Sequence, residues 1–376
     1  MKVALLSPFG EKLSGGIVNW TKHIMDYYSG NHGDVDIRLL YNKDPIVHKG
    51  RGHVLHQLFA GVSNYLPICY DFIKLVRKEN IDVVHICSSA KFGLVRDLIV
   101  TKSAHRHGIK VVVHFHFGRA SKILSDTNWE HRLFIRLINK VDRAIVIDMK
   151  SYNSLRQYGF SNVNYLPNPL GISIQKYISE RIGLKREPRK LVFAGHIVRA
   201  KGVYELVEAC RDIKDIKLVL LGQAVNEAIP IELKALAGEN SDSWLSFAGN
   251  VSLDKVIDEM MTCSVFVLPT YTEGFPYVII ESMACGCPIV TTPVGAIPEM
   301  LALNSDKPCG ICVEPKNVHQ LHDAIVNLLE NRGLANTLSE RSQNRANEEF
   351  SMDRIWNQLL RIWGSVLNED TIPLNN

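Results

Sequence analysis

The sequence predicts an α/β protein made of two doubly wound, Rossmann-like domains that face a cleft. Its 376 residues are too many for one core and suggest two domains of roughly 150 to 200 residues. In each half, short runs rich in Val and Ile alternate with longer segments of helical spacing. That alternation is typical of a parallel sheet covered on both faces. Between the halves lies YGFSNVNYLPNPLGIS, which has two prolines and two glycines.

The N-terminal half is predicted to begin with the strand VALLSP, the glycine-containing loop FGEKLSGG and the helix IVNWTKHIMDYY. Three further strands are expected at IDVVHICS, GIKVVVHFH and VDRAIVID, with segments of helical spacing such as LPICYDFIKLVRKEN between them. We assign residues 1–170 to this domain and residues 171–187 to a linker.

The C-terminal half repeats this pattern over residues 188–350. RKLVFAG, IKLVLLG, LSFAG, CSVFVLP and CPIVTTP read as strands, and KGVYELVEACRDI has helical spacing. Residues 351–376 begin with an amphipathic helix, which we expect to pack back across the domain boundary; a helix lying on a membrane surface is the alternative. No run is apolar enough to span a membrane, and the start lacks the features of a signal peptide, so we expect a cytoplasmic protein.

The stretch EGFPYVIIE has a carboxylate at each end, Glu273 and Glu281. It follows an expected strand, so the loop and the start of the next helix should lie at the carboxyl edge of the sheet. A helix start binds phosphate, and Gly274 lets the backbone approach a ligand. Glu281 could accept hydrogen bonds from a ribose diol, and Glu273 could hold a second sugar. The alternative is that Glu281 only favours the helix dipole and Glu273 is solvated.

GHIVRAKG follows another expected strand and brings His196, Arg199 and Lys201 to the same edge. Cations placed there would stabilise a departing diphosphate without a metal. The alternative is an ordinary basic helix start on the surface.

The eight cysteines lie mostly among apolar neighbours, which favours small buried core residues over zinc ligands. The motif Asp34-Val35-Asp36 precedes an early strand and is interpreted as surface. We therefore expect no metal and no cofactor other than a nucleotide sugar used as co-substrate.

These motifs resemble the retaining glycosyltransferases of family 4, which have the GT-B fold. The matching stretches are GHIVRAKG, FAGNVS, VFVLPTYTEGFPYVIIESMACGCPIV, TPVGAIPEM and GICVEP, and they occur in the family's order over most of residues 190–315. In the N-terminal half the match is looser: SGG at 14–16, HFH at 114–116 and the LPN of LPNPLG.

The resemblance implies a role for each matching position. Glu273 would contact the donor sugar, Glu281 the ribose and Lys201 the diphosphate. His196 stands where the family has an arginine, and Arg199 is the candidate to compensate. His116, with His114 as the second choice, would lie beside the reacting sugar. We predict Glu273 and His116 as catalytic, and as donor-binding Gly15, Gly16, His196, Arg199, Lys201, Asn250, Val251, Gly274, Phe275, Pro276, Tyr277 and Glu281.

The implied reaction is metal-independent transfer, of the hexosyltransferase type, from a nucleotide diphosphate sugar with retention at the anomeric carbon. The leaving diphosphate could itself take the proton of the acceptor, so no strong side-chain base is needed. The alternatives are a nucleotide-sugar 2-epimerase of the same fold and a nucleotide-sugar-binding protein without turnover.

The uneven charge of the two halves indicates what kind of acceptor the protein binds. Residues 1–187 contain 27 Lys and Arg against 15 Asp and Glu, and the remainder contains 16 against 24. The balances of +12 and −8 predict an acidic partner for the N-terminal domain, such as a glycan or lipid-linked acceptor at an anionic membrane surface on the inner face of the cell membrane. Dispersed basic residues do not favour nucleic acid. Candidate acceptor contacts are Arg51, Arg119, Lys122, Arg132, Arg136 and Lys140.

Overall fold

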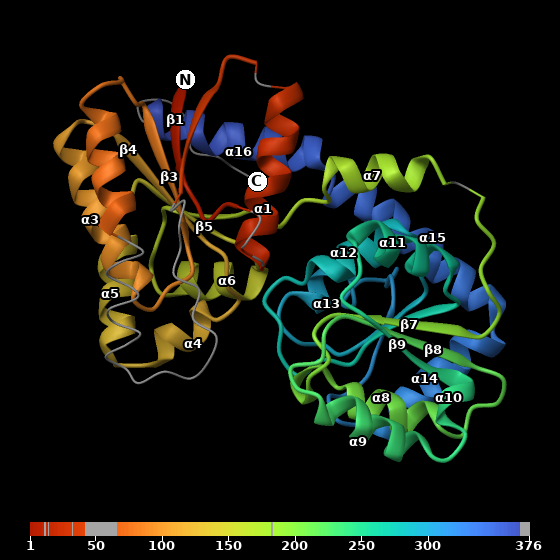
Figure 1. Ribbon diagram of the computed structural model, residues 1–376. Coiled ribbons are helices and arrows are strands. Elements are labelled where there is room, and N and C mark those ends of the chain that lie inside the picture. Colours follow the sequence, from red (N-terminus) through yellow and green to blue (C-terminus); the bar gives the residue numbers. More distant parts are fainter. Residues whose placement is uncertain (11–12, 14, 32, 42–65, 182, 369–376) are drawn as a thin grey trace. The chain divides into compact units, whose positions relative to one another are not determined.

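The computed structural model describes residues 1–10, 13, 15–31, 33–41, 66–181 and 183–368 (Figure 1). The chain forms two compact units, which are described separately below. Unit 1 consists of Met1–Asn168 and Ile355–Asn376, and unit 2 consists of Pro169–Arg354. Each contains one parallel six-stranded sheet with helices on both faces, so the predicted α/β class with two doubly wound domains is confirmed.

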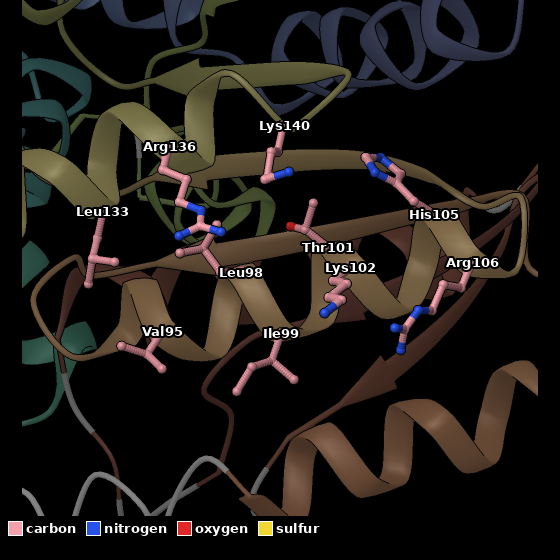
Figure 2. Close-up of a pocket in the computed structure, with 10 residues that line it drawn as sticks. All are labelled: Val95, Leu98, Ile99, Thr101, Lys102, His105, Arg106, Leu133, Arg136 and Lys140. Atoms are coloured by element: carbon pink, nitrogen blue, oxygen red, sulfur yellow. The ribbon is translucent and has the colours of Figure 1, made fainter.

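The sheet of unit 1 has the strand order β2-β1-β3-β4-β5-β6, with every neighbouring pair parallel. Its strands are β1 (Lys2–Leu6), β2 (Asp36–Leu40), β3 (Val83–Ser88), β4 (Lys110–Phe115), β5 (Arg143–Val146) and β6 (Val163–Tyr165). Its helices are α1 (Gly16–Gly30), α3 (Gly93–Arg106), α4 (Ala120–Ser125), α5 (Trp129–Ile138) and α6 (Met149–Gln157), and residues 66–76 are also helical. On the outer side of α3 and α5 lies a groove whose residues are drawn in Figure 2.

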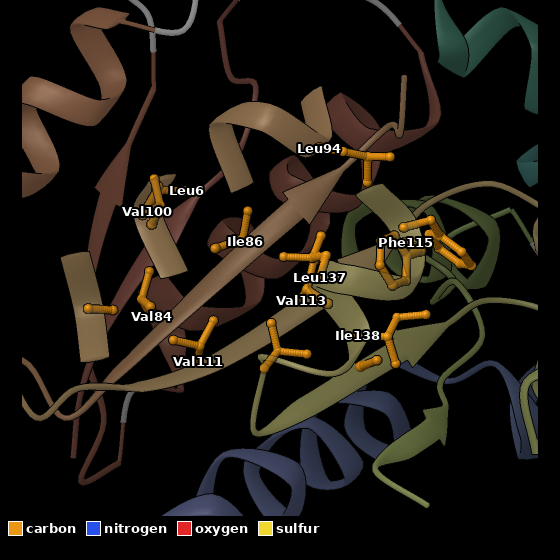
Figure 3. Close-up of a cluster of buried hydrophobic side chains, with 14 of the residues drawn as sticks. Leu6, Val84, Ile86, Leu94, Val100, Val111, Val113, Phe115, Leu137 and Ile138 are labelled. Carbon is orange, nitrogen blue, oxygen red and sulfur yellow. The ribbon is translucent and has the colours of Figure 1, made fainter. Parts of the chain in front are cut away.

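The two faces of this sheet differ in chemistry. Side chains alternate between faces along a strand, so Val84 and Ile86 of β3 lie on one face with Val113 of β4. That face packs under α3 and α5 in an apolar cluster, which Figure 3 shows with Leu94 and Leu137. The strands are buried along almost their whole length because helices cover both faces.

The opposite face of the sheet carries a cluster of buried histidines. His85 of β3 and His114 of β4 are fully buried there. The ring of Trp20, on α1, stacks on His85 at 5.4 Å and meets His114 edge-on at 5.0 Å. The ring of His116 lies 3.9 Å from that of His114. Burial lowers the pKa of His85 and of His116 to about 3, and that of His114 well below its ordinary value, so the packing requires neutral imidazoles.

Helix α16 (Met352–Leu367), near the C-terminal end of the sequence, packs on this cluster. The indole Nε1 of Trp363 donates a hydrogen bond of 3.0 Å to Nδ1 of His85, and Trp356 packs on Tyr27 of α1. Ile355 and Leu359 of the predicted apolar stripe are also buried. From Ile355 on, the helix therefore forms part of the unit that contains the first 168 residues; residues 369–376 of the predicted terminal segment lie outside the described residues.

Unit 2 has the strand order β12-β11-β10-β7-β8-β9, again with every pair parallel. Its strands are β7 (Lys190–Ala194), β8 (Lys217–Leu221), β9 (Leu245–Gly249), β10 (Val265–Leu268), β11 (Ile289–Thr291) and β12 (Ile311–Cys312). Its helices are α7 (Ile172–Ser179), the 3₁₀ helix η1 (Arg199–Lys201), α8 (Val203–Cys210), α9 (Ala228–Ala237), α10 (Ser241–Trp244), α11 (Leu253–Thr262), α12 (Tyr277–Ala284), α13 (Ile297–Met300), α14 (Val318–Glu330) and α15 (Arg332–Glu349).

The segment expected to be a linker contains helix α7. The helix packs against α11 and α12, and the backbone N–H of Leu170 donates to the carbonyl oxygen of Phe350 at 2.7 Å. Residues 171–187 thus belong to unit 2, and the division falls after Asn168 instead of at residue 170. The prolines and glycines that suggested a linker lie just before the helix. Seven of the eight cysteines are buried, as their apolar neighbours predict.

The buried histidines make unit 1 sensitive to acid. Their folded-state pKa values lie below the unfolded value of about 6.5, so their neutral form stabilises the fold above that pH. Stability should fall as the pH drops from 6.5 towards 4, by up to about 1.4 kcal/mol per pH unit for each buried histidine. We expect His114→Phe to reduce the slope of the unfolding free energy against pH by the contribution of one histidine, up to about 1.4 kcal/mol per pH unit. Urea unfolding at a series of pH values measures this slope.

The matched control is His107→Phe, at an exposed position after α3. It should leave the pH dependence of the unfolding free energy as in the unaltered protein. Equal slopes for the two variants would contradict the assignment of the acid sensitivity to the cluster.

Candidate functional site

The carboxyl edge of the unit 2 sheet gathers the candidate residues. The strand order places β7 beside β10, and β10 beside β11. In doubly wound sheets ligands bind outside the carboxyl ends of the strands, where the strand order reverses. The first strand of the unit, β7, has β8 on one side and β10 on the other, so the reversal lies between β7 and β10.

Hydrogen bonds to one backbone carbonyl group join the loop after β10 to the loop after β7. The N–H of Tyr271 donates to the carbonyl oxygen of Ala200 at 2.9 Å, and the hydroxyl of Thr270 donates to the same oxygen at 3.3 Å. Gly202 has a φ of 71°, and a Cβ there would overlap the backbone carbonyl of Pro269. Only glycine allows the two loops to approach this closely.

Lys201 and Glu273, which are 72 residues apart in sequence, form an ion pair at this edge. The lysine Nζ donates to Oε1 of Glu273, and the side chains are 24% and 13% exposed. Behind Glu273, the N–H of Ala296 donates to the carbonyl oxygen of Gly274 at 2.9 Å. The family resemblance implies separate roles for these two charged residues, Lys201 on the diphosphate and Glu273 on the sugar, and the structure brings them into direct contact.

Gly295, in the loop after β11, packs against the backbone of Glu273. It has a φ of 59°, and a Cβ there would overlap the carbonyl oxygens of Glu273 and Gly274. Sequence reasoning did not single out this glycine. The glycine of TPVGAIPEM, which directly follows an expected strand, is the sequence feature that indicates this turn.

Glu281 lies in α12, which begins directly after Pro276. Its side chain is buried, and no described side chain or backbone group donates a hydrogen bond to its carboxyl group. Loss of solvent raises the pKa of Glu281 to about 7. A buried carboxyl group without donors is costly to ionise, and a ligand with two adjacent hydroxyl groups would supply the missing donors.

Other residues predicted on α12 are less accessible than expected. Tyr277 and Phe275 are buried, and the Phe275 ring packs edge-on against Phe350 at 5.8 Å. Pro276 is the N-cap of the helix. Phe275 and Pro276 thus hold the loop in place. The N–H of Ile279 donates to the carbonyl oxygen of Pro276 at 3.1 Å, so α12 begins directly after the loop.

The basic loop after β7 differs from the expectation in one respect. His196 is exposed, and the guanidinium group of Arg199 lies 3.8 Å above the ring of Tyr204 on α8. This cation–π contact orients Arg199 along the helix that begins after η1. Within the described residues Arg199 forms no ion pair, so its charge is not neutralised by a carboxylate.

Asn250 and Val251 follow β9, further along the same edge. Asn250 is exposed and Val251 is half-buried. The preceding Gly249 accepts a hydrogen bond of 2.8 Å from the N–H of Gly222 after β8, which fixes the position of the turn that leads to them.

The remaining predicted residues belong to unit 1 and lie after β1 and β4 of its sheet. Gly15, with a φ of 123°, is the N-cap of α1, and Gly16 is its first residue. Ser14 lies outside the described residues. Neither ring nitrogen of His116 has a hydrogen-bond partner among the described residues. Sequence reasoning missed Trp20 and His85, which pack with it and with His114.

Comparison with known proteins identifies both halves of the chain. Residues 14–173 match the family model described as Glycosyltransferase Family 4, and residues 175–345 match the one described as Glycosyl transferases group 1. An uncharacterized glycosyltransferase of Methanocaldococcus jannaschii is 27% identical over 339 residues, which cover 89% of this chain and 86% of that protein. A capsular polysaccharide biosynthesis glycosyltransferase of Staphylococcus aureus is 26% identical over 60% of each chain. The crystal structure of Anabaena HepE in complex with UDP has a TM-score of 0.72 at 16% identity, covering 97% of this chain and all of that one.

The close approach at Gly202 gives a stability test. We expect Gly202→Ala to lower the free energy of unfolding by about 2 kcal/mol or more, because a Cβ at this positive φ also meets the Pro269 carbonyl. Gly333→Ala is the control, since Gly333 lies in α15 and a Cβ there meets only the Asn331 side chain at 3.6 Å. The control should gain roughly 0.5–1 kcal/mol. Thermal and urea unfolding measure both, and similar behaviour of the two variants would contradict the packing at Gly202.

Proposed function

Because the chain belongs to glycosyltransferase family 4, we propose that it transfers a sugar from a nucleotide diphosphate sugar, a UDP-sugar in the simplest case, with retention at the anomeric carbon. The acceptor proposed here is a glycan or a lipid-linked glycan of a bacterial surface polysaccharide. The chain is a glycosyltransferase of GT-B fold by its family matches and its two-sheet architecture. Donor, stereochemistry and acceptor are our proposals.

The observation that carries the donor assignment is the buried, donor-free carboxyl group of Glu281. A ribose offers two adjacent hydroxyl groups, and each can donate to a carboxylate oxygen. Such charge-assisted hydrogen bonds are about twice as strong as neutral ones. The complex of HepE with UDP, which has the same fold, supports the choice of a uridine nucleotide.

The diphosphate would lie between Glu281 and the loop after β7. The first turn of α12 presents backbone N–H groups and the positive end of the helix dipole. Lys201 is within reach of the same place, although it is paired with Glu273 in the ligand-free chain. On donor binding, the phosphate oxygens would compete for the ammonium group and free one carboxylate oxygen of Glu273 to accept from the sugar hydroxyls.

The reaction then proceeds by departure of the diphosphate and attack of the acceptor on the same face of the sugar. Lys201 and the start of α12 stabilise the negative charge that develops on the leaving group. A phosphate oxygen takes the proton of the acceptor hydroxyl, so a separate base is not required. The proposal involves no metal, since fixed positive groups supply the charge. His116 is proposed to contact the donor sugar from unit 1.

The acceptor is proposed from the chemistry of unit 1 and from one relative. The capsular polysaccharide biosynthesis glycosyltransferase of S. aureus supports a surface glycan as the product. The positive balance of residues 1–187 suits an acidic or diphosphate-linked acceptor. We propose that the chain works in the cytoplasm and on the inner face of the membrane. In the described residues, no helix has both the length and the apolarity required to cross a bilayer.

Replacement of Glu273 tests the catalytic assignment. We expect Glu273→Gln to reduce kcat by roughly 100-fold or more, because the loss of one preorganised electrostatic contact at a reacting centre has that effect. The affinity for UDP should stay within a few fold, since the glutamine still accepts from Lys201. Transfer from a panel of UDP-sugars and UDP binding by calorimetry measure the two quantities.

The control is Glu239→Gln, at an exposed position after α9 with no described side-chain partner; its kcat should be unchanged. Retained activity of Glu273→Gln would remove Glu273 from the mechanism. Acceptor-dependent UDP release separates a transferase from the remaining classes. A 2-epimerase would release UDP without an acceptor, and a binding protein would release none.

A further inference from the structure

An open groove of about 680 Å³ lies on unit 1 between α3 and α5, and no role above uses it as a whole. Figure 2 shows that its two ends differ. Val95 and Leu133 lie at one end, near the starts of the two helices. Lys102 and Lys140 lie further along, with His105 and Arg106 at the far end, and Arg136 lies near Leu98 and Leu133. The groove therefore changes from apolar to basic along its length.

The apolar end exposes large side chains to solvent. Val95 and Ile99, one turn apart on α3, are 44% and 45% exposed, and Trp129 at the start of α5 is 47% exposed. The Trp129 ring stacks on Phe92 at 5.1 Å, just before α3 begins, so all three belong to one surface. Single exposed apolar residues are ordinary, but a contiguous group marks an interaction surface.

Most cations at the basic end have no acidic partner among the described residues. Lys102, Arg136 and Lys140 form no ion pair there, and no Asp or Glu lines the groove. His105, at the same end, lies 3.4 Å from a carboxylate oxygen of Asp142. The carboxylates of the two helices are engaged elsewhere. Asp97 of α3 is buried in a pair with Arg96, at 2.6 Å. Glu130 of α5 is paired with Arg119.

A simpler explanation covers only part of this surface. Basic residues in the last turn of a helix interact favourably with the helix dipole, and this accounts for Arg136 of α5 and Arg106 of α3. It does not account for Lys102 and Lys140, or for the exposed side chains of Ile99 and Trp129. A surface with apolar side chains beside unpaired cations has the composition of a membrane-interface surface, where tryptophan lies at the headgroup level and lysine and arginine meet lipid phosphates.

We propose that the α3–α5 surface, defined by Val95, Ile99, Trp129, Lys102, Arg136 and Lys140, docks the protein on a bilayer that contains anionic phospholipids. The apolar end inserts among the headgroups, and the basic end contacts lipid phosphates. This proposal names the surface for the membrane location given under the proposed function and rests on it for the kind of partner. An acidic polysaccharide would satisfy the cations but would leave the apolar end without a partner.

The test is flotation of the full chain with vesicles of phosphatidylcholine alone and of phosphatidylcholine mixed with phosphatidylglycerol. The unaltered protein should float only with the anionic vesicles. The triple variant Lys102→Gln, Arg136→Gln, Lys140→Gln should bind them roughly 100-fold more weakly, because each basic residue near an anionic surface contributes about 1 kcal/mol, or about fivefold. The triple variant Lys74→Gln, Lys78→Gln, Lys150→Gln removes the same charge from exposed positions elsewhere on unit 1 and should bind as the unaltered protein does.

A second variant tests the apolar end. Trp129→Ala should weaken binding to the anionic vesicles roughly tenfold through lost apolar burial. Circular dichroism and the thermal midpoint of each variant verify that it is folded. Equal binding by the two triple variants, equal binding to both kinds of vesicle, or binding to heparin in the absence of vesicle binding would each overturn the proposal.

UDP release with a water-soluble acceptor separates this proposal from the proposed function. The Trp129→Ala variant should keep that activity, because Trp129 makes none of the proposed donor or acceptor contacts. If the unaltered protein floats with anionic vesicles but transfers no sugar, the docking proposal is supported and the proposed function is contradicted. If it transfers sugar but does not float, the proposed function is supported and the docking proposal is contradicted.

Discussion

The close approach of two backbone segments at the edge of the second sheet determines the rest of the candidate site. Gly202 lies against the carbonyl of Pro269, and Gly295 lies against the carbonyl of Glu273; neither position has room for a Cβ. Three loops from three neighbouring strands are thereby held in one place. The Lys201–Glu273 ion pair and the start of α12 follow from this packing, because both depend on where the loop after β10 runs.

Both units bury ionisable side chains, and the hydrogen-bond and ring contacts around these side chains differ between the units. In unit 1 the imidazoles pack against Trp20 and Trp363 and stay neutral, with His85 accepting from the indole of Trp363. In unit 2 no described residue donates a hydrogen bond to the Glu281 carboxyl group, and burial raises its pKa to about 7. The neutral imidazoles avoid the cost of burying a charge, although the ring nitrogens of His114 and His116 have no hydrogen-bond partner among the described residues. The raised pKa of Glu281 reflects the cost of burying a carboxylate, and we interpret this group as a ligand contact.

Local patterns predicted much of this structure, and contacts between distant residues limited the rest. The two sheets, the strand–loop–helix around EGFPYVIIE and the helix that begins at Met352 follow from periodicity and turn chemistry. The histidine cluster could not be foreseen, because the Trp363–His85 hydrogen bond joins residues 278 apart in sequence. Helix α7 was missed because prolines and glycines just before it suggested a linker. The contact between Lys201 and Glu273 was missed because each was considered only with a ligand.

The state of the Glu281 carboxyl group in the complex tests this account most directly. Burial raises the pKa of Glu281 to about 7, so part of the free protein carries a proton on this group near neutral pH. A ribose diol that donates to the carboxylate should lower that pKa and expel the proton. Calorimetric titration with UDP at pH 7, in buffers of different ionisation enthalpy, counts the protons released. We expect the unaltered protein to release more protons per UDP than Glu281→Gln, by no more than one; equal release by the two proteins would contradict the account.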